Sequence, residues 1–209
     1  MPSKPTNAIS KLIVLLITLL IIICSLVLYF DQSDLIPIKS KYDNHIYYVR
    51  NLRDKHKAVK LLTHVRFNLI KVVNHLKHKY PDDPRILFLI KNFKPNSDNI
   101  SESIGNSKYT SYTINKGQKV VFCIRQRDMK NNLCDFNTIM FVALHELTHM
   151  MTKSRDHVEE FWENMKFVLK EVITSNLNVY KYQPYHKIPR EYCGTTITDT
   201  PYKHDQEVN

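Results

Sequence analysis

Glycine is scarce in this sequence, and its cysteines lie far apart. The 209 residues include three glycines and four cysteines, at positions 24, 123, 134 and 193, with no C-x-x-C pair. So little glycine argues against a glycine-rich phosphate-binding loop and against a β-sandwich with many tight turns. Three of the cysteines lie outside an apolar N-terminal run. That odd number does not suggest a disulfide framework and favours a reducing compartment.

Acidic residues are also in short supply. Thirty Lys and Arg stand against twenty Asp and Glu, which gives a net charge of +10. Such a charge suits polyanionic partners such as nucleic acid or anionic lipid, although a solvated basic surface has the same composition. The length fits one domain with appendages and is sufficient for one sizeable core.

No charged residue occurs in Leu12–Phe30. As a helix this stretch would be about 28 Å long, close to the hydrocarbon thickness of a bilayer. A cleaved signal peptide is less favoured, because its apolar region is normally shorter and no small-residue cleavage site follows. We expect a tail at 1–11, a transmembrane anchor at Leu12–Phe30, a linker at 31–46 and a domain at 47–209. Lysines flank the span on both sides, so the side of the membrane that carries the domain stays open.

Apolar residues recur at three- and four-residue steps between 51 and 80, which predicts a long helix that ends before Pro81. Between positions 50 and 79 this helix has nine Lys or Arg and only one acidic residue, Asp54. The basic helix 50–80 could bind nucleic acid or anionic lipid. Alternatively, it is a core helix with a solvated charged back.

Three apolar stretches are typical of strands. Arg85–Ile90 indicates a short buried strand, and 92–108 is loop-like. Tyr109–Ile114 and Lys119–Ile124 indicate two strands joined by a turn at 115–117. Val120–Ile124 is a candidate edge strand that could receive an extended peptide, or else an ordinary strand of a sheet.

The motif His145-Glu146-Leu-Thr-His149 lies on a predicted helix, Phe136–Thr152, that Asp135 can cap. Histidines four residues apart on a helix point the same way, so both imidazoles can bind one metal ion. Glu146 lies beside that face, where its carboxylate can reach a water on the metal. The sequence therefore predicts a zinc site.

A catalytic zinc needs a third protein ligand. The candidates downstream are Asp156, His157, Glu159 and Glu160. Asp156 and Glu159 fit the D-x-x-E pattern of a helix start, which leaves His157 in the first turn as the favoured ligand, with Glu159 or Glu160 as alternatives. Trp162 is expected in the core or in the wall of a pocket.

The spacing of His145, His149, His157 and Phe161-Trp162 resembles the signature of WLM-type, SprT/Spartan-like zinc metallopeptidases, and most of all WLM-like proteins of large DNA viruses. The further motifs that carry this resemblance are a K-Y-T-S-Y hairpin at 108–112, an F-C-x-R strand at 122–125 and a Y-C-G tail at 192–194. The resemblance covers roughly 50–201. It implies one catalytic Zn²⁺ held by the three histidines, with Glu146 as the general base.

The sequence departs from this family pattern at two points. Asp156 stands where many relatives have glycine before the third histidine. The membrane span is not part of the pattern, which argues against the nuclear DNA-repair role of the cellular relatives.

The C-terminal segment is rich in tyrosine and proline and is expected to wrap over the domain. Tyr192 is a candidate catalytic residue, because a tyrosine hydroxyl can stabilise the oxyanion formed in peptide hydrolysis. It could equally be a packing aromatic. Cys193 could cap the metal as an inhibitory thiolate.

We therefore expect an α+β fold, a small zincin-like metallopeptidase domain with a mixed sheet and long helices, preceded by one transmembrane helix. The predicted function is that of a membrane-anchored zinc endopeptidase that cleaves a protein or peptide substrate. If it is viral, it would be a single-pass protein of a host or virion membrane. The alternatives are a non-catalytic zinc module and a membrane-tethered basic protein that binds nucleic acid or anionic lipid.

Overall fold

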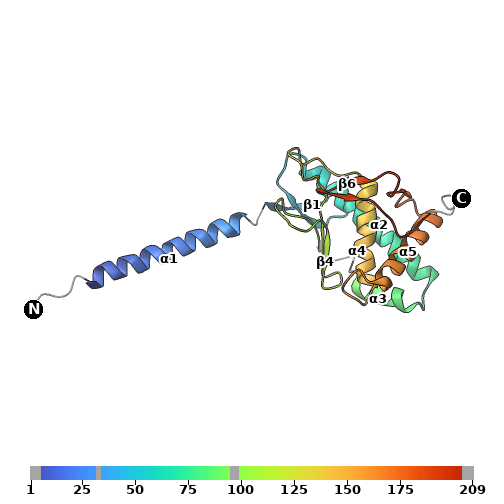
Figure 1. Ribbon diagram of the computed structural model, residues 1–209, viewed down its shortest axis with the longest axis horizontal. Coiled ribbons are helices and arrows are strands. Elements are labelled where there is room, and N and C mark those ends of the chain that lie inside the picture. The colour runs from blue at the N-terminus through green and yellow to red at the C-terminus, as the bar shows by residue number, and fades with distance from the viewer. Residues whose placement is uncertain (1–5, 32–33, 95–98, 204–209) are drawn as a thin grey trace, which may run out of the picture. The chain divides into compact units, whose positions relative to one another are not determined.

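A computed structural model describes residues 6–31, 34–94 and 99–203 (Figure 1). Contacts divide the chain into two units, Met1–Asp34 and Leu35–Asn209. Of the five helices among the described residues, four lie in the second unit together with the mixed sheet, which confirms the predicted α+β class.

The first unit is formed by helix α1 (Thr6–Asp31). Within it, Ile9–Val27 is 19 residues long with a mean hydropathy of 2.8, which is enough to cross a membrane by length and composition. The Thr18 hydroxyl donates to the carbonyl oxygens of Val14 and Leu15, so this polar side chain is satisfied within the helix. The predicted anchor therefore coincides with a single apolar helix.

The sheet of the second unit has five strands. Its spatial order is β1 (Leu35–Lys39), β2 (Ile46–Arg50), β3 (Ile100–Glu102), β5 (Lys119–Phe122) and β4 (Tyr112–Ile114). The β1–β2 and β4–β5 pairs are antiparallel, whereas β3 is parallel to both of its neighbours. The predicted hairpin around 115–117 is confirmed, since β4 and β5 pair across it.

The sheet differs from the expectations at both ends and in its middle. Residues 35–39 were expected in a linker but form edge strand β1, where Pro37 is tolerated because an edge strand has one unpaired side. Strand β3 lies within the expected loop 92–108 and is too short to show a periodic pattern. Val120–Ile124 does not supply the sheet edge, because β3 and β4 flank β5 on both sides. The edge strand at this end is β4.

Helices pack on one face of the sheet. The strand pairing places Val49, Ile100, Val120 and Thr113 on this face, whereas Tyr48 points to the other side. Helix α2 (Lys55–Lys79) contacts β2 and β3, and helix α4 (Phe136–Met151) contacts β4 and β5. The predicted helix over 51–80 is thus confirmed, with one side buried along its length.

Helix α3 (Pro84–Asn92) occupies the stretch that was expected to be a buried strand. Asp83 caps it by accepting a hydrogen bond from the backbone N–H of Arg85, and Pro84 occupies the first turn. Ile86 and Leu89, three residues apart, are fully buried. A short apolar run does not distinguish a strand from a helix by periodicity alone, and here the cap decides.

Helix α4 is the central helix of the domain. It contacts α2, α3 and helix α5 (Glu159–Thr174) as well as the sheet (Figure 1). The Asp135 carboxylate accepts from the backbone N–H of Thr138, which confirms the predicted cap. Its apolar side chains are buried, among them Ile139, Met140, Leu144 and Leu147.

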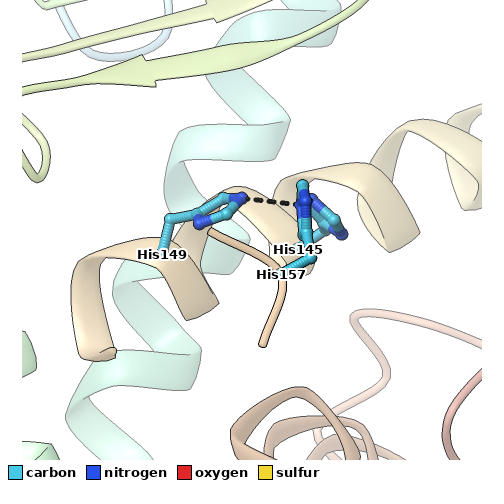
Figure 2. Close-up of side chains that lie close together, drawn as sticks. All are labelled: His145, His149 and His157. Atoms are coloured by element: carbon cyan, nitrogen blue, oxygen red, sulfur yellow. Dashed lines mark hydrogen bonds between the residues drawn. The ribbon is translucent and has the colours of Figure 1, made fainter. Parts of the chain in front are cut away.

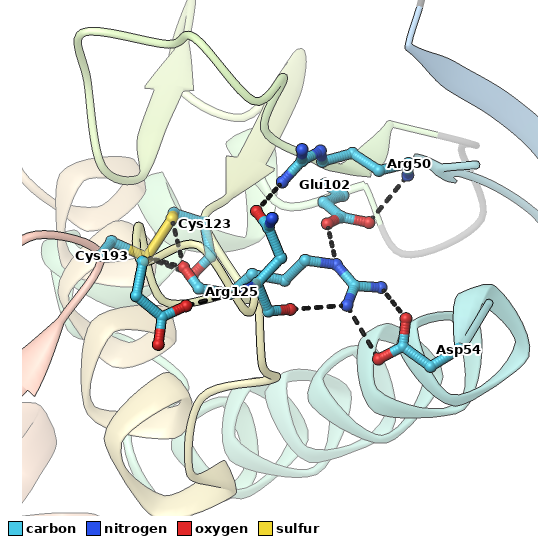
Figure 3. Close-up of polar contacts among 8 residues, drawn as sticks. Arg50, Asp54, Glu102, Cys123, Arg125 and Cys193 are labelled. Carbon is cyan, nitrogen blue, oxygen red and sulfur yellow. Dashed lines mark hydrogen bonds and ion pairs between the residues drawn. A yellow bond between two sulfur atoms is a disulfide. The ribbon is translucent and has the colours of Figure 1, made fainter. Parts of the chain in front are cut away.

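A buried arginine joins segments at the C-terminal ends of β2, β3 and β5 (Figure 3). The side chain of Arg125, 3% exposed, pairs with Glu102 at 2.7 Å and with Asp54 at 2.8 Å. The second oxygen of Glu102 accepts from the backbone N–H of Arg50 at 2.8 Å. These contacts link β2, β3, the residues after β5 and the start of α2. A buried arginine needs such pairing because an unpaired charge is costly in the interior.

The C-terminal segment is cross-linked to the sheet. Strands β6 (Arg190–Tyr192) and β7 (Thr195–Ile197) form a hairpin, and Cys193 at its turn is in a disulfide with Cys123 (Figure 3). The expectation of reduced cysteines is therefore wrong for this pair. The two residues are 70 positions apart, so their spacing carried no sign of the bond. Cys134 stays a free thiol, and burial raises its pKa to about 11.

Breaking this disulfide is expected to destabilise the domain. A cross-link over a loop of this length contributes about 4 kcal/mol to the free energy of unfolding by restricting the unfolded chain. Cys193→Ser should therefore lower the midpoint of thermal unfolding of the full chain in neutral detergent. It should also remove the sensitivity of that midpoint to reductant.

The control is Cys24→Ser, which removes a free thiol of α1. Its melt should still shift when reductant is added. A wild-type melt that reductant does not change would contradict the cross-link.

Candidate metal centre

Three histidines meet between α4 and the segment that precedes α5 (Figure 2). Helix α4 presents His145 and His149 one turn apart, with ring centroids 4.9 Å from each other. The Nε2 atom of His157 lies 2.9 Å from that of His145 and 3.1 Å from that of His149. Among the described residues, this is the one cluster of three or more His, Cys, Asp or Glu that could hold a metal ion.

The spacing of these nitrogens fits zinc. Two nitrogens bound to one zinc at 2.0–2.1 Å in tetrahedral geometry lie about 3.3 Å apart. The two Nε2–Nε2 distances of 2.9 and 3.1 Å are close to this value. Three imidazole nitrogens around one point, without a carboxylate, form a donor set that suits zinc and leaves a fourth position open.

The surroundings keep two of these imidazoles neutral. Burial, together with the neighbouring His149 and His157, lowers the pKa of His145 to about 3. Burial, together with His157 and Lys116, lowers the pKa of His149 to about 4. A neutral imidazole has a lone pair available for a metal, so protons compete weakly at these two positions.

Two aromatic residues of α5 support the histidines. The ring of Phe161, which is fully buried, lies 4.4 to 4.8 Å from the ring centroids of all three. Trp162 stacks on His157 with a centroid distance of 5.6 Å and is 43% exposed. Of its two predicted places, Trp162 therefore belongs to the wall of the site rather than to the core. The helical pattern alone did not reveal that Phe161 faces the histidines.

A lysine from the β4–β5 hairpin holds the loop between the second and third histidines. Lys116 Nζ donates to the carbonyl oxygens of Thr152 at 2.6 Å and Ser154 at 2.5 Å. Gly117, with a φ of +107°, lets the hairpin lie close to the end of α3. A Cβ at this position would lie 2.8 Å from the carbonyl oxygen of Asn92. Sequence reasoning missed Lys116, since a lysine in a turn gives no sign of a distant partner.

The turn before α5 differs from the prediction. The helix begins at Glu159 after Val158, and no side chain caps it, so Asp156 is not the cap. His157 therefore lies in the loop rather than in the first helical turn. Glu160 is turned toward this loop, where its carboxylate accepts from the backbone N–H groups of Lys153 and Ser154 at 3.4 Å. The D-x-x-E pattern was misleading because the helix starts later than it indicates, with Val158 at the cap position and Glu159 as the first helical residue.

Glu146 lies beside the histidines in a buried position and is 3% exposed. Its Oε2 accepts a hydrogen bond of 2.8 Å from Thr113 Oγ1 on β4. Burial raises the pKa of Glu146 to about 7, although the hydrogen bond from Thr113 opposes this shift. A carboxyl group with such a pKa can take up and release a proton near neutral pH.

Tyr192 and Cys193 are occupied by other contacts. The Tyr192 side chain is 2% exposed, its hydroxyl lies 2.7 Å from Ser111 Oγ, and burial raises its pKa. The role of Tyr192 as an oxyanion donor stays a prediction, and this geometry favours a packing and anchoring role. Cys193 cannot serve as a thiolate cap on the metal while it is bonded to Cys123.

The basic helix α2 is a core helix with a charged back. One side is buried against the sheet and α4, and Glu171 of α5 accepts hydrogen bonds from Lys79 and Tyr80 at its end. The exposed side carries a stripe of residues spaced three and four apart. These residues, the basic stripe, are Arg53 just before the helix and Lys57, Lys60, His64, Phe67 and Lys71 on it.

Comparisons with known proteins agree with the motif. A family model described as the WLM domain matches residues 42–208. The chain is 31% identical over 195 residues to an uncharacterized protein of Acanthamoeba polyphaga mimivirus, which covers 91% of this chain and 98% of that protein. It is 29% identical over 84 residues to an uncharacterized protein of Invertebrate iridescent virus 6, which covers 40% of this chain and 44% of that protein.

No solved structure matches the chain. Both of these relatives are viral proteins, in agreement with the predicted resemblance. The family match runs from the turn before β2 through the three histidines and the C-terminal hairpin. The chain belongs to the WLM domain family.

Proposed function

We propose that this protein is a zinc-dependent peptidase that hydrolyses peptide bonds with Glu146 as general base. The observation that carries the proposal is the convergence of three histidine Nε2 atoms beside a buried carboxylate on the same helix. WLM family membership supports it, because the family is associated with zinc and related to peptidases. The arrangement of sheet, central helix and following helix is the one expected for a small zincin-like domain.

His145, His149 and His157 would hold the zinc ion. When bound, zinc supplies Lewis acidity, which activates water and polarises a peptide carbonyl. Glu146 removes a proton from the attacking water and delivers it to the leaving amine. The protein contributes neutral imidazoles, a carboxyl group that titrates near neutral pH, and rigid support from Phe161 and Trp162.

Strand β4 is the place for an extended substrate. It is the last strand of the sheet in the described part of the domain, and it carries the residue that contacts Glu146. A polypeptide segment that pairs with this edge would lie alongside the catalytic helix. This assignment replaces the expected role of Val120–Ile124.

The protein would act at a membrane through α1. The Cys123–Cys193 disulfide favours a side of the membrane where disulfides persist. The length and apolar composition of Ile9–Val27 support a lipid partner for this helix.

Zinc content tests the ligand assignment. Purified wild-type chain should contain one zinc, and His149→Ala or His157→Ala should lose it. Altering a residue that only contacts a metal ligand lowers metal affinity by about 10- to 100-fold. The loss of zinc affinity in these two variants should be larger. The measurement is metal analysis by mass spectrometry together with competition against a chromogenic chelator.

Glu159→Ala is the matched control, because Glu159 is exposed and was the alternative ligand. It should bind zinc as the wild type does. Zinc loss in Glu159→Ala with retention in His157→Ala would reverse the assignment.

Proteolysis tests the role of Glu146. Glu146→Gln should keep its zinc and lose about 100-fold or more in the rate of cleavage of fluorescein-labelled casein, because an amide cannot accept the proton. Self-cleavage, followed by gel electrophoresis, should fall in parallel. Equal activity in wild type and Glu146→Gln would refute the peptidase mechanism, whereas equal zinc content in His149→Ala and wild type would refute the metal site.

The basic stripe of α2 supports a second proposal, a polyanion partner. Its basic side chains surround an exposed Phe67, which is 42% accessible, and such a combination suits a nucleic acid strand or an anionic lipid headgroup. The peptidase proposal does not depend on this surface.

Reversing the charge of the stripe tests this second proposal. The double variant Lys57→Glu and Lys60→Glu should weaken binding of labelled single-stranded DNA or short-chain phosphatidylserine by about tenfold at low salt. The control is Lys166→Glu with Lys170→Glu, the same change on the exposed side of α5. If both double variants weaken binding equally, the net charge of the protein explains the binding and the basic stripe is not a specific site.

A further inference from the structure

Thr113 connects the edge strand to the catalytic helix. On β4 its neighbours Tyr112 and Ile114 point to one face of the sheet, so Thr113 points to the other, where α4 packs. Its hydroxyl donates to Glu146 Oε2 at 2.8 Å. A hydrogen bond from a neutral donor to a carboxylate is among the stronger kinds, and here the acceptor is almost fully buried.

This contact makes the surroundings of the two carboxylate oxygens different. Oε2 accepts the hydrogen bond from Thr113, and this is the one hydrogen bond of the Glu146 carboxylate among the described residues. A threonine hydroxyl has a single proton to donate, and here it is directed at Oε2. This bond restrains the rotation of the carboxylate group about its last side-chain bond. One oxygen is thus fixed by the sheet, and the other stays available to a water molecule.

The strand that carries Thr113 is itself held at both ends. Before it, Ser111 Oγ accepts from the backbone N–H of Cys123 at 3.1 Å and lies 2.7 Å from the Tyr192 hydroxyl. After it, Lys116 binds the carbonyl oxygens at the end of α4. These contacts keep the Thr113 hydroxyl at one position relative to α4, which a loosely held edge strand would not do.

We propose that Thr113 is a positioning residue for the reaction, which orients the Glu146 carboxylate through Oε2. The inference rests on the proposed peptidase function. Because the donor lies on edge strand β4, the strand that would pair with an extended substrate also orients the base that acts on it. Tyr192 braces this strand, because its hydroxyl contacts Ser111.

The test compares two substitutions at Thr113 in the full chain. Thr113→Val keeps the shape and the β-branch of the side chain but removes the hydroxyl, whereas Thr113→Ser keeps the hydroxyl. Turnover and KM are measured with fluorescein-labelled casein, and zinc content by metal analysis. Binding of acetohydroxamic acid, a zinc chelator that shares a proton with the base carboxylate, is measured by calorimetry and needs no turnover.

The chain contains a matched control. Thr196 Oγ1 donates to Glu191 Oε1 at 2.8 Å, the same kind of bond at the same distance, on the exposed hairpin β6–β7. Thr196→Val therefore removes an equivalent hydrogen bond away from the site. It should change neither turnover nor hydroxamate affinity.

Thr113→Val is expected to lower kcat by about 10- to 100-fold, the effect of losing a hydrogen bond to a charged group. Its KM should stay within about twofold and its zinc content should be unchanged, while hydroxamate affinity falls by several fold. Thr113→Ser should stay within about threefold of the wild type in every measurement. A merely structural threonine would instead give parallel losses in zinc content and thermal stability.

Each outcome decides between the two proposals. If Glu146→Gln is inactive but Thr113→Val has wild-type turnover and hydroxamate affinity, Thr113 does not position the base and the peptidase function stands. If Glu146→Gln has wild-type activity, or no protein form cleaves casein or binds the hydroxamate, the peptidase function fails and the positioning role fails with it.

Discussion

The domain depends on a central helix that is apolar for most of its length and polar near its C-terminal end. Burying α4 between the sheet and α2, α3 and α5 stabilises the fold through its apolar side chains. The same burial imposes a cost on His145, Glu146 and His149, because polar groups in the interior need partners. The site supplies these partners. Thr113 donates a hydrogen bond to Glu146, and the three imidazoles are directed at one another.

The third histidine is positioned by contacts from outside the helix that carries the motif. His157 lies on a loop, which has no regular hydrogen bonding of its own to place a side chain. Lys116 and Glu160 bind backbone groups of that loop, and Phe161 fills the space beneath all three rings. The geometry of the centre therefore depends on the β4–β5 hairpin and on α5 as much as on the helix that carries the motif.

The C-terminal segment has a comparable dependence on tertiary contacts. In the part that the structure describes, up to residue 203, its regular secondary structure is a short hairpin, which contributes little to its position. The Cys123–Cys193 bond and the Tyr192–Ser111 contact attach it to the residues after β5 and before β4. Close to the same point, Arg125 joins the sheet to the start of α2. Cross-links and buried ion pairs thus take the place of a larger core at this end of the domain.

The sequence by itself determined what local periodicity controls. Helical spacing put His145, Glu146 and His149 together, and it also located α1, α2 and the capped start of α4. Strands β4 and β5 followed from apolar runs on both sides of a turn. Each of these features is set by residues within a few positions of one another.

Only the tertiary structure decided the remainder. The position of β1 in the sheet, the order that makes β4 rather than β5 the edge, and the disulfide depend on segments far apart in the chain. The α3 stretch was misassigned because a short apolar run suits either a helix or a strand. The Thr113–Glu146 contact, 33 residues apart, belongs to the same class. Which distant segments pair depends on which surfaces are buried against each other in the folded domain. A pattern of neighbouring residues does not contain this information.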